Sequence, residues 1–285
     1  GQGATFARGD AFIINSTELY TPLDGAVGTI GEWAEVSSVS GDTLTLTAEL
    51  RFSYDTALGT VKIHRSAQWI DLTLSNPQFQ GPGIFSASNT QGDRGIEFIG
   101  VKSLTVEGGE VRDSDAHSLT VHNAYAMRVT GFSSRKFEAS PPGDTRTRYG
   151  LSIIGNTSIV RVTDCDFTGG TEQVALTTSG YPSGVKRNVI IRGNRFAGAE
   201  RSGITTHYDY DPDSYLIEGN QFYDCLQAAD MRLGGMFNDN QVRSTTGSLD
   251  CAVQLGAGFK YLSASGNDIE DVLRGYYLPP VLAHF

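Results

Sequence analysis

Glu172 and Asp230 are the acidic residues best placed for catalysis, because each stands just before a short apolar segment, residues 174–176 and 231–233. Glycoside hydrolysis requires two carboxyl groups, one that protonates the leaving oxygen and one that acts as base or nucleophile. Two coils of a strand stack separate the pair by roughly 9.6 Å, the upper edge of the inverting range. We therefore predict Glu172 and Asp230 as the catalytic pair, with Asp209 as the substitute for either. The alternative is that each is a solvated turn residue.

Several neighbouring side chains have types that suit a sugar substrate. His207 follows Thr205 along the same strand and is a candidate base or orienting group, although a surface histidine is often inert. Arg232 is a candidate for bidentate hydrogen bonds to a sugar or carboxylate, or for an ion pair with Asp230. Aromatic rings combine an apolar face with a polar tip and so suit sugar stacking. The predicted substrate-binding residues are Arg232, Thr205, Tyr149, Tyr181, Tyr208 and Tyr210.

Two acidic clusters were considered as metal sites. Residues 113–117 (Asp-Ser-Asp-Ala-His) lack the alternating donors, glycine and distant glutamate of a calcium loop. Asp209, Asp211 and Asp213 alternate in the required way, but Pro212 interrupts them and the later glycine and glutamate are missing. We predict no required metal and no cofactor.

An imperfect repeat indicates the elements that position these residues. An apolar segment is followed by a turn with Asn and then by an aromatic or β-branched residue, at intervals of roughly 20–35 residues. One coil cannot bury its apolar residues alone, so successive coils must stack. The Asn side chains then fall at the same turn and form a hydrogen-bonded ladder, a structural role. The ladder residues are Asn194, Asn220, Asn240 and Asn267.

A second repeated element has an in-out-in pattern, typical of a strand with one buried face. We interpret its copies as rungs of one parallel sheet, with the middle residues in an exposed row. Those middle residues are Thr120, Ser152, Ala175, Thr205, Arg232 and Gln254. The fold class is therefore all-β, a right-handed single-stranded parallel β-helix. A β-sandwich or propeller is the alternative architecture, but neither explains the Asn-plus-aromatic register.

The N-terminal part of the chain differs from the repeats. Residues 31–46 predict a hairpin with a Ser-Gly-Asp turn, and residues 61–64 and 69–74 predict further strands. We assign residues 1–94 to a β-rich module that caps the open end of the solenoid, and residues 95–285 to the coils, within one continuous structure. Longer excursions at 133–149, 177–187 and 207–215 are expected to wall a groove across the coils.

Composition limits the class of function. The formal net charge of −10 argues against a nucleic-acid partner and gives no long-range attraction for a polyanion. No apolar run approaches a membrane span. The three cysteines lack a disulfide spacing, which favours buried free thiols. The start Gly-Gln-Gly-Ala has neither an initiator Met nor signal-peptide features, so we expect a fragment or a processed form.

The chain resembles a known family in four places: Gly9-Asp10, the strand at residues 31–36, SVSGDTLTLT at residues 38–47, and the later Gly-Asn-x-Phe coils. These look like the pectate-lyase-like β-helix domains of bacteriophage tailspikes. The resemblance covers most of the chain as a pattern. It implies a homotrimer in the virion tail, or otherwise extracellular, that binds a bacterial capsule, lipopolysaccharide or exopolysaccharide and often cleaves it.

The reaction is less defined than the fold. No Asn-Thr-Asp motif of polygalacturonases is present, and Asp211-Pro212-Asp213 is only a partial match to the Asp-Pro-His motif of alginate epimerases. A depolymerase that hydrolyses is favoured slightly by the acidic charge. A lyase or epimerase would use His207 or Tyr208 as base with Arg232 against the uronate. A non-catalytic glycan-binding adhesin and a purely structural spike are the remaining hypotheses.

Overall fold

A computed structural model of the chain shows an all-strand protein. The structure describes residues 5–20, 28–50, 53–54, 56–65, 70–81, 95–114, 116–136, 148–177, 186–207, 215–232, 234–247, 250–256 and 261–277. Within these ranges no α-helix occurs, and so no helix is long and apolar enough to cross a membrane.

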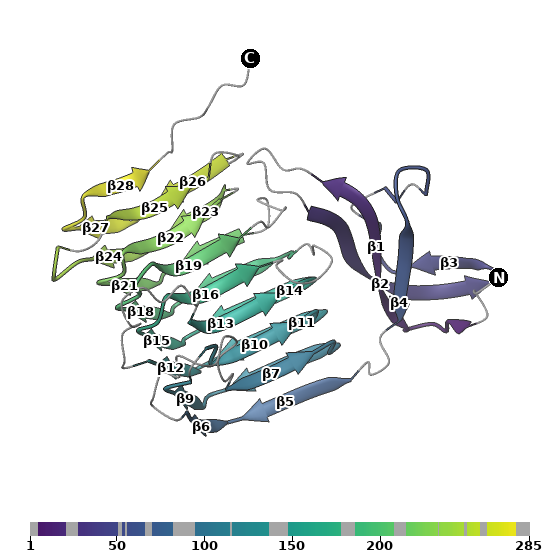
Figure 1. The fold of residues 1–285 in the computed structure, drawn as a ribbon, viewed down its shortest axis with the longest axis horizontal. Helices are drawn as coiled ribbons and strands as arrows, with labels where there is room; N and C mark the ends of the chain where they lie inside the picture. Colours follow the sequence, from purple (N-terminus) through teal and green to yellow (C-terminus); the bar gives the residue numbers. More distant parts are fainter. Residues whose placement is uncertain are drawn as a thin grey trace, which may run out of the picture.

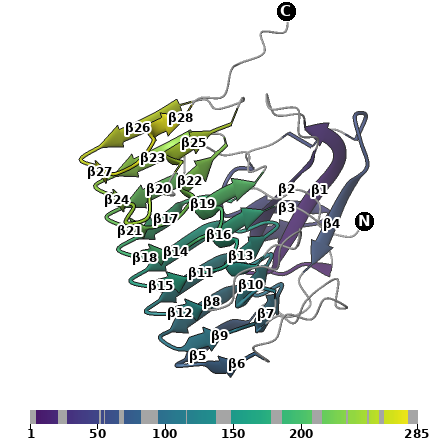
Figure 2. The same ribbon diagram turned by 60° about the vertical axis from the view of Figure 1, so that its left-hand side comes forward.

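Three parallel sheets of eight strands each form a stack of coils (Figures 1 and 2). Sheet I contains β7 (Ile96–Ile99), β10 (Leu119–His122), β13 (Tyr149–Ile154), β16 (Glu172–Thr177), β19 (Ser202–His207), β22 (Gln227–Met231), β25 (Cys251–Leu255) and β28 (Arg274–Tyr277). Sheet II contains β5 (Asp71–Ser75), β8 (Ser103–Glu107), β11 (Ala126–Thr130), β14 (Ile159–Thr163), β17 (Val189–Arg192), β20 (Tyr215–Glu218), β23 (Gly234–Asn238) and β26 (Tyr261–Ser265). Sheet III contains β6 (Gln78–Gln80), β9 (Glu110–Arg112), β12 (Ser133–Arg135), β15 (Asp166–Thr168), β18 (Arg195–Ala197), β21 (Gln221–Tyr223), β24 (Gln241–Arg243) and β27 (Asp268–Glu270). The chain visits sheets II, III and I in turn, which confirms the right-handed parallel β-helix.

The interior of the stack is filled by side chains that repeat from coil to coil. Phe167, Phe196 and Phe222 are fully buried, and their rings stack at centroid distances of 5.4 and 4.8 Å. Because one strand is about 4.8 Å from the next, equivalent rings in successive coils meet face to face. The aromatic residue that recurs in the sequence repeat is therefore a ring stacked in the core.

The predicted asparagine ladder is confirmed at the turn between sheets II and III. Each Asn side-chain NH₂ donates to the side-chain oxygen of the next, from Asn194 to Asn220 (2.9 Å), to Asn240 (3.0 Å) and to Asn267 (3.2 Å). The residue before each Asn has a positive φ, for example 68° at Gly193. Glycine adopts this left-handed conformation without steric cost, which explains the Gly-Asn pairs of the repeat.

The cysteines are buried and free, as expected. Burial raises the pKa of the Cys165 and Cys225 thiols to about 12 and that of Cys251 to about 11. Thiols with such pKa values remain protonated and are poor nucleophiles. They are therefore core residues.

The N-terminal module is an antiparallel sheet with the strand order β3-β2-β1-β4, formed by β1 (Ala11–Tyr20), β2 (Gly28–Ser40), β3 (Thr43–Leu46) and β4 (Val61–Arg65). The predicted hairpin is β2–β3, with Ser40 opposite Thr43. The sheet lies beside the stack in both views (Figures 1 and 2). Trp33 Nε1 donates to the backbone oxygen of Asn156 at 2.9 Å, and Glu32 pairs with Arg187.

These contacts bear on the predicted capping role of the module. Trp33 and Glu32 contact the middle coils, where Asn156 and Arg187 lie, and the cover of an open end stays a prediction. The parallel ladders also begin at Asp71, in β5, inside the segment 1–94 that the sequence analysis gave to the module. The short strand at residues 69–74 alternates like its successors, and the aperiodic residues after it hid that continuity. The boundary near residue 95 stays a prediction.

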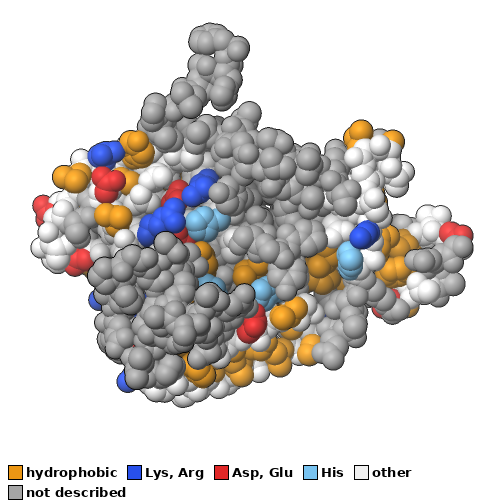
Figure 3. Space-filling model, in the orientation of Figure 1, with side chains coloured by type: hydrophobic (Ala, Val, Ile, Leu, Met, Phe, Trp, Pro, Cys, Tyr) orange, Lys and Arg blue, Asp and Glu red, His pale blue; other side chains and the backbone are white. Residues whose placement is uncertain are grey.

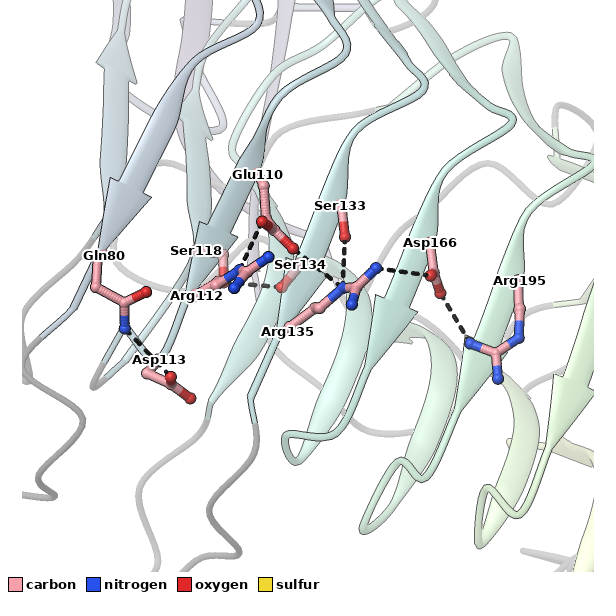
Figure 4. Close-up of polar contacts among 10 residues, drawn as sticks. All are labelled: Gln80, Glu110, Arg112, Asp113, Ser118, Ser133, Ser134, Arg135, Asp166 and Arg195. Atoms are coloured by element: carbon pink, nitrogen blue, oxygen red, sulfur yellow. Dashed lines mark hydrogen bonds and ion pairs between the residues drawn. The ribbon is translucent and has the colours of Figure 1, made fainter.

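The outer side of sheet III carries a chain of ion pairs (Figure 4). Glu110 accepts from Arg112 at 2.6 Å and lies 3.1 Å from Arg135, whose guanidinium lies 3.8 Å from Asp166. Asp166 in turn pairs with Arg195 at 3.0 Å. Across these four coils, each of the five charged side chains thus contacts a partner of opposite sign.

Candidate functional site

The strand register of sheet I defines the row of side chains on its outer face. Thr120 pairs with Ser152, Ser152 with Ala175, Ala175 with Thr205, Thr205 with Asp230, and Asp230 with Gln254. The residues on either side, such as Leu119 and Val121, belong to the core. Because successive side chains in a strand point to opposite faces, the row points away from the core.

Two expectations about this row are wrong. Asp230, not Arg232, occupies the row in β22, since Ala229 and Met231 pair with Val253 and Leu255. The in-out-in pattern predicted Met231 and Leu233 as the inward residues, whereas the small residue Ala229 takes the first inward position and shifts the register by two. The row is also not exposed. Its first five members, Thr120, Ser152, Ala175, Thr205 and Asp230, are buried.

Glu172 is held by two cationic or proton-donating side chains. Its carboxylate is fully buried at the start of β16. Oε2 accepts a hydrogen bond from Nε2 of His207 at 2.8 Å, and Oε1 lies 3.2 Å from Nη1 of Arg201. The Arg201 contact is an ion pair without the alignment of a hydrogen bond, so Oε1 accepts none within the described part of the chain. The contacts fix the carboxylate and leave Oε1 without a hydrogen bond among the described residues.

Asp230 is the second buried carboxylate of the cluster. Its Oδ2 lies 3.6 Å from Nε of Arg232, and its Oδ1 has no hydrogen-bond partner among the described residues. Burial raises the pKa of Asp230 above its usual range, Glu172 raises it further, and the neighbouring Arg232, His207 and Arg201 lower it. The charges of Glu172, Arg201, His207 and Arg232 all act on Asp230, which therefore lies close to Glu172 and its partners.

Arg232 is positioned through the backbone. Its N–H donates to Thr206 Oγ1 at 3.1 Å, and the same hydroxyl donates to the backbone oxygen of Asp230 at 3.3 Å. Of the two roles predicted for Arg232, the structure contains the ion pair with Asp230. Figure 3 shows basic, histidine and acidic side chains gathered over β19 and β22, on the face of sheet I.

The structure brings together five of the predicted residues: Glu172, His207, Asp230, Arg232 and Thr205. Thr205 pairs with Asp230 in the row, and its buried Oγ1 has no partner within the described ranges. Tyr149 pairs with Glu172 in register, but its ring stacks on His117 at 4.6 Å, which occupies one of its faces. Asp209, Tyr181, Tyr208 and Tyr210 lie outside the described residues.

Sequence reasoning missed Arg201. This residue directly precedes β19, and its N–H donates to the backbone oxygen of Thr171, next to Glu172 in the coil before. Aligning residues 174–176 with 204–206 places Arg201 beside Glu172, so the signal was present in the rung alignment. Among the described residues, no group of three or more His, Cys, Asp or Glu side chains is arranged to hold a metal ion.

The fold and this cluster define a parallel β-helix with a buried, charged site on the outer face of one sheet. No protein-family model matches the chain, and no curated protein matches its sequence. Among solved structures, the chain is similar to the Gp54 tailspike of Acinetobacter baumannii bacteriophage AP22, which was solved in complex with an A. baumannii capsular saccharide.

That likeness has a TM-score of 0.53 at 17% identity and covers 97% of this chain and 42% of the tailspike. The chain thus spans less than half of that protein's length, and the likeness concerns the fold. A second similar structure is the Pseudomonas phage phi297 tailspike gp61, with a TM-score of 0.42, 14% identity, and coverage of 92% of this chain and 53% of that one.

Proposed function

We propose that this chain is the β-helix of a phage tailspike that binds a bacterial surface polysaccharide and cleaves it by glycoside hydrolysis at Glu172 and Asp230. The observation that carries the proposal is the pair of buried carboxylates two coils apart, with different partners. A buried ionisable group with a perturbed pKa, next to specific charged partners, is a candidate for acid–base chemistry. The fold likeness to a tailspike solved with a capsular saccharide supports the substrate class.

Asp230 is assigned as the general acid. Burial raises the pKa of its carboxyl group, which keeps the proton that the leaving oxygen needs. As the bond between the anomeric carbon and the glycosidic oxygen breaks, this proton passes to the oxygen and leaves Asp230 as a carboxylate. Arg232, 3.6 Å away, then stabilises the new negative charge.

Glu172 is assigned as the general base. Two coil spacings of about 4.8 Å put its strand roughly 9.6 Å from that of Asp230 along the axis, and the register places Glu172 level with Gln227, three residues before Asp230. This offset is compatible with the wider carboxyl spacing of inverting enzymes, which leaves room for a water. Its Oε1 takes a proton from the water that attacks the anomeric carbon, and the hydroxide oxygen becomes the new hydroxyl of the sugar. His207 and Arg201 hold the carboxylate in place during this step.

A lyase is the second candidate, and the two arginines beside His207 favour it for a uronate polymer. Arg201 and Arg232 would pair with the uronate carboxylate and so acidify the C5 proton, which a base at His207 would remove. The C4–C5 double bond would form as the glycosidic bond between C4 and oxygen breaks, and the leaving oxygen would take a proton from water. The new double bond absorbs in the ultraviolet, whereas hydrolysis gives no such absorbance.

The test is a reducing-end assay on a panel of bacterial capsular, lipopolysaccharide and exopolysaccharide samples, with wild type, Glu172→Gln and Asp230→Asn. New reducing ends that disappear in either variant, while binding persists, support hydrolysis. Reducing ends with ultraviolet absorbance support the lyase. Binding without cleavage across the panel makes the chain an adhesin and returns both carboxylates to a structural role. No binding to any sample overturns the proposal.

The proposal includes a homotrimer in the virion tail, an assembly that the family resemblance implies. Light scattering on the purified chain measures its mass in solution. A mass three times the 30.6 kDa of one chain supports the trimer, and a monomer removes this part of the proposal.

A further inference from the structure

We propose that Glu97, Thr120 and Ser152 form a second sugar subsite on the outer face of sheet I. The polysaccharide occupies this subsite and the Glu172–Asp230 cluster at the same time. The proposal rests on the polysaccharide function proposed above. It says where the bound polysaccharide extends beyond the Glu172–Asp230 cluster, and which kind of sugar unit is bound there.

The first observation is a pair of hydroxyl groups that lack partners. Thr120 Oγ1 and Ser152 Oγ are fully buried and have no hydrogen bond to any residue that the structure describes. Leaving a hydroxyl buried and unbonded is unfavourable, so native proteins rarely do so without a reason. Each hydroxyl can donate one hydrogen bond and accept others, as the hydroxyls of a sugar can.

Such hydroxyls are concentrated on one face of the molecule. Four serine and threonine hydroxyls are buried and unpartnered among the described residues: Thr120, Ser152, Thr205 and Thr157. The first three belong to one row on sheet I. In contrast, the interior hydroxyls of Ser114, Ser118 and Ser134 bond to one another at 2.8–3.1 Å. The row therefore differs from buried hydroxyls that serve packing.

The second observation is a carboxylate–imidazole pair at the far end of the row. Glu97 pairs with Thr120 in the strand register, and its Oε1 lies 2.7 Å from Nε2 of His122. The Glu97 side chain is 34% exposed, whereas that of His122 is 4% exposed. Glu97 thus marks a solvent-facing end of the row, next to the two unpartnered hydroxyls.

The length of the row indicates the ligand. From Thr120 to Asp230 the row crosses four strand spacings, about 19 Å in total. Ala175, in the middle, carries only a methyl group, which separates the hydroxyls of Thr120 and Ser152 from the Thr205–Asp230 part. A ligand that satisfies both parts must be a chain of several linked sugars. Thr120 and Ser152 offer hydroxyl groups and Glu97 offers hydrogen-bond acceptors, so the unit bound there is rich in hydroxyl groups, whereas the Glu172–Asp230 cluster binds the reacting unit.

The experiment measures affinity by titration calorimetry in an Asp230→Asn background, which prevents cleavage of the ligand. The ligands are long and short oligosaccharides prepared from a polysaccharide that the wild type binds. The test variant is Thr120→Val with Ser152→Ala, which removes both hydroxyls at nearly constant shape. The control is Thr163→Val on sheet II, where Thr163 Oγ1 bonds to Thr130 Oγ1 at 3.0 Å.

The test variant is expected to bind the long oligosaccharide about 5–10-fold more weakly, the effect of one or two ordinary hydrogen bonds. Binding of the short oligosaccharide is expected to stay unchanged, and the melting temperature is expected to stay equal or to rise. The control is expected to bind both ligands as the background does. Equal affinity of the test variant for the long oligosaccharide, or an equal loss for both lengths, overturns the second subsite. A wild type that binds none of the panel polysaccharides overturns the function and the subsite together.

Discussion

The outer faces of sheets I and III present polar side chains in opposite ways. On sheet III, Arg112, Glu110, Arg135, Asp166 and Arg195 form consecutive ion pairs, and the arginines are 40–48% exposed (Figure 4). On sheet I, the carboxylates of Glu172 and Asp230 are buried, and Asp230 Oδ1 has no partner among the residues described.

The difference separates a face whose charges are paired from a face with buried polar atoms that lack partners among the described residues, which is the feature on which the proposed ligand site rests. Exposed pairs contribute little to stability and remain hydrated, so the sheet III ladder has the properties of a solvated surface. Buried polar atoms without partners are costly, so each of them requires an explanation, and a bound molecule that supplies the missing bonds is one. Both faces belong to the same solenoid, with the same strand spacing, so the contrast comes from the side chains and from what covers them.

The largest expected effect is on catalysis at sheet I. Asp230→Asn or Glu172→Gln is expected to lower kcat by about 10²–10⁴-fold, the usual contribution of a general acid or base. Both substitutions keep the side-chain shape and so preserve binding. The measurement is the rate of reducing-end release at saturating polysaccharide.

The matched control on sheet III is Asp166→Asn, an exposed carboxylate in an ion pair. Its kcat is expected to equal that of the wild type. Equal losses of kcat in the control and in the sheet I variants would mean that the two faces do not differ in their contribution to catalysis.

A second prediction uses the interior, where polar groups are buried but paired. Asn220→Ala removes a side chain whose NH₂ donates to Asn240 Oδ1. The side-chain oxygen of Asn220 accepts two hydrogen bonds, from the side-chain NH₂ and from the backbone N–H of Asn194. Because buried donors are then left unbonded, the free energy of unfolding is expected to fall by about 2–4 kcal/mol. Chemical denaturation measures it.

Asn267 is the matched control for the ladder, because it lies at the ladder's end and is only partly buried. Asn267→Ala is expected to cost less than half as much. If the two substitutions cost the same, burial does not determine the contribution of a ladder position.

The raised pKa of Asp230 also predicts that the stability of the protein depends on pH. Burial raises the pKa of this carboxyl group above its ordinary value of 3.8, so the folded state holds the proton more tightly than the unfolded state. The stabilising contribution of the protonated form is complete below pH 3.8 and is lost as the pH rises through the folded-state pKa. An asparagine does not titrate. Melting temperatures from pH 4 to pH 8 are therefore expected to rise in Asp230→Asn relative to wild type as the pH increases, and a constant difference would contradict the raised pKa.

The repeat was predictable because it is local. The Gly-Asn-x-Phe pattern specifies a left-handed turn, a ladder and a stacked ring within a few residues, and the asparagine ladder confirmed it. The rung pattern also predicted Glu172, Asp230 and His207 at or beside strands of one sheet, and the structure brings their side chains into one cluster. Arg201 was missed because its partner is in another coil, and Arg232 was put into the row because Ala229 is too small to identify as an inward residue.

Burial of the row was also beyond the sequence. Alternation gives the direction of a side chain but not what lies over it, so Thr120 and Ser152 were expected to be exposed. The sequence also could not predict that the Thr120 and Ser152 hydroxyls lack partners among the described residues, which is the basis of the second subsite.

The smallest expected effect is at the centre of the sheet III ladder. Arg135→Ala breaks the contacts with Glu110 and Asp166, but the side chain is 40% exposed and each acid keeps a second arginine, Arg112 or Arg195. The free energy of unfolding is therefore expected to fall by less than about 1 kcal/mol, and by less still at high salt, which screens exposed pairs. Urea denaturation at low and high ionic strength measures both values. A loss of several kcal/mol that salt does not change would mean that the sheet III ion pairs form a structural network. The two faces would then differ in the proposed ligand site and not in the stability that their charges provide.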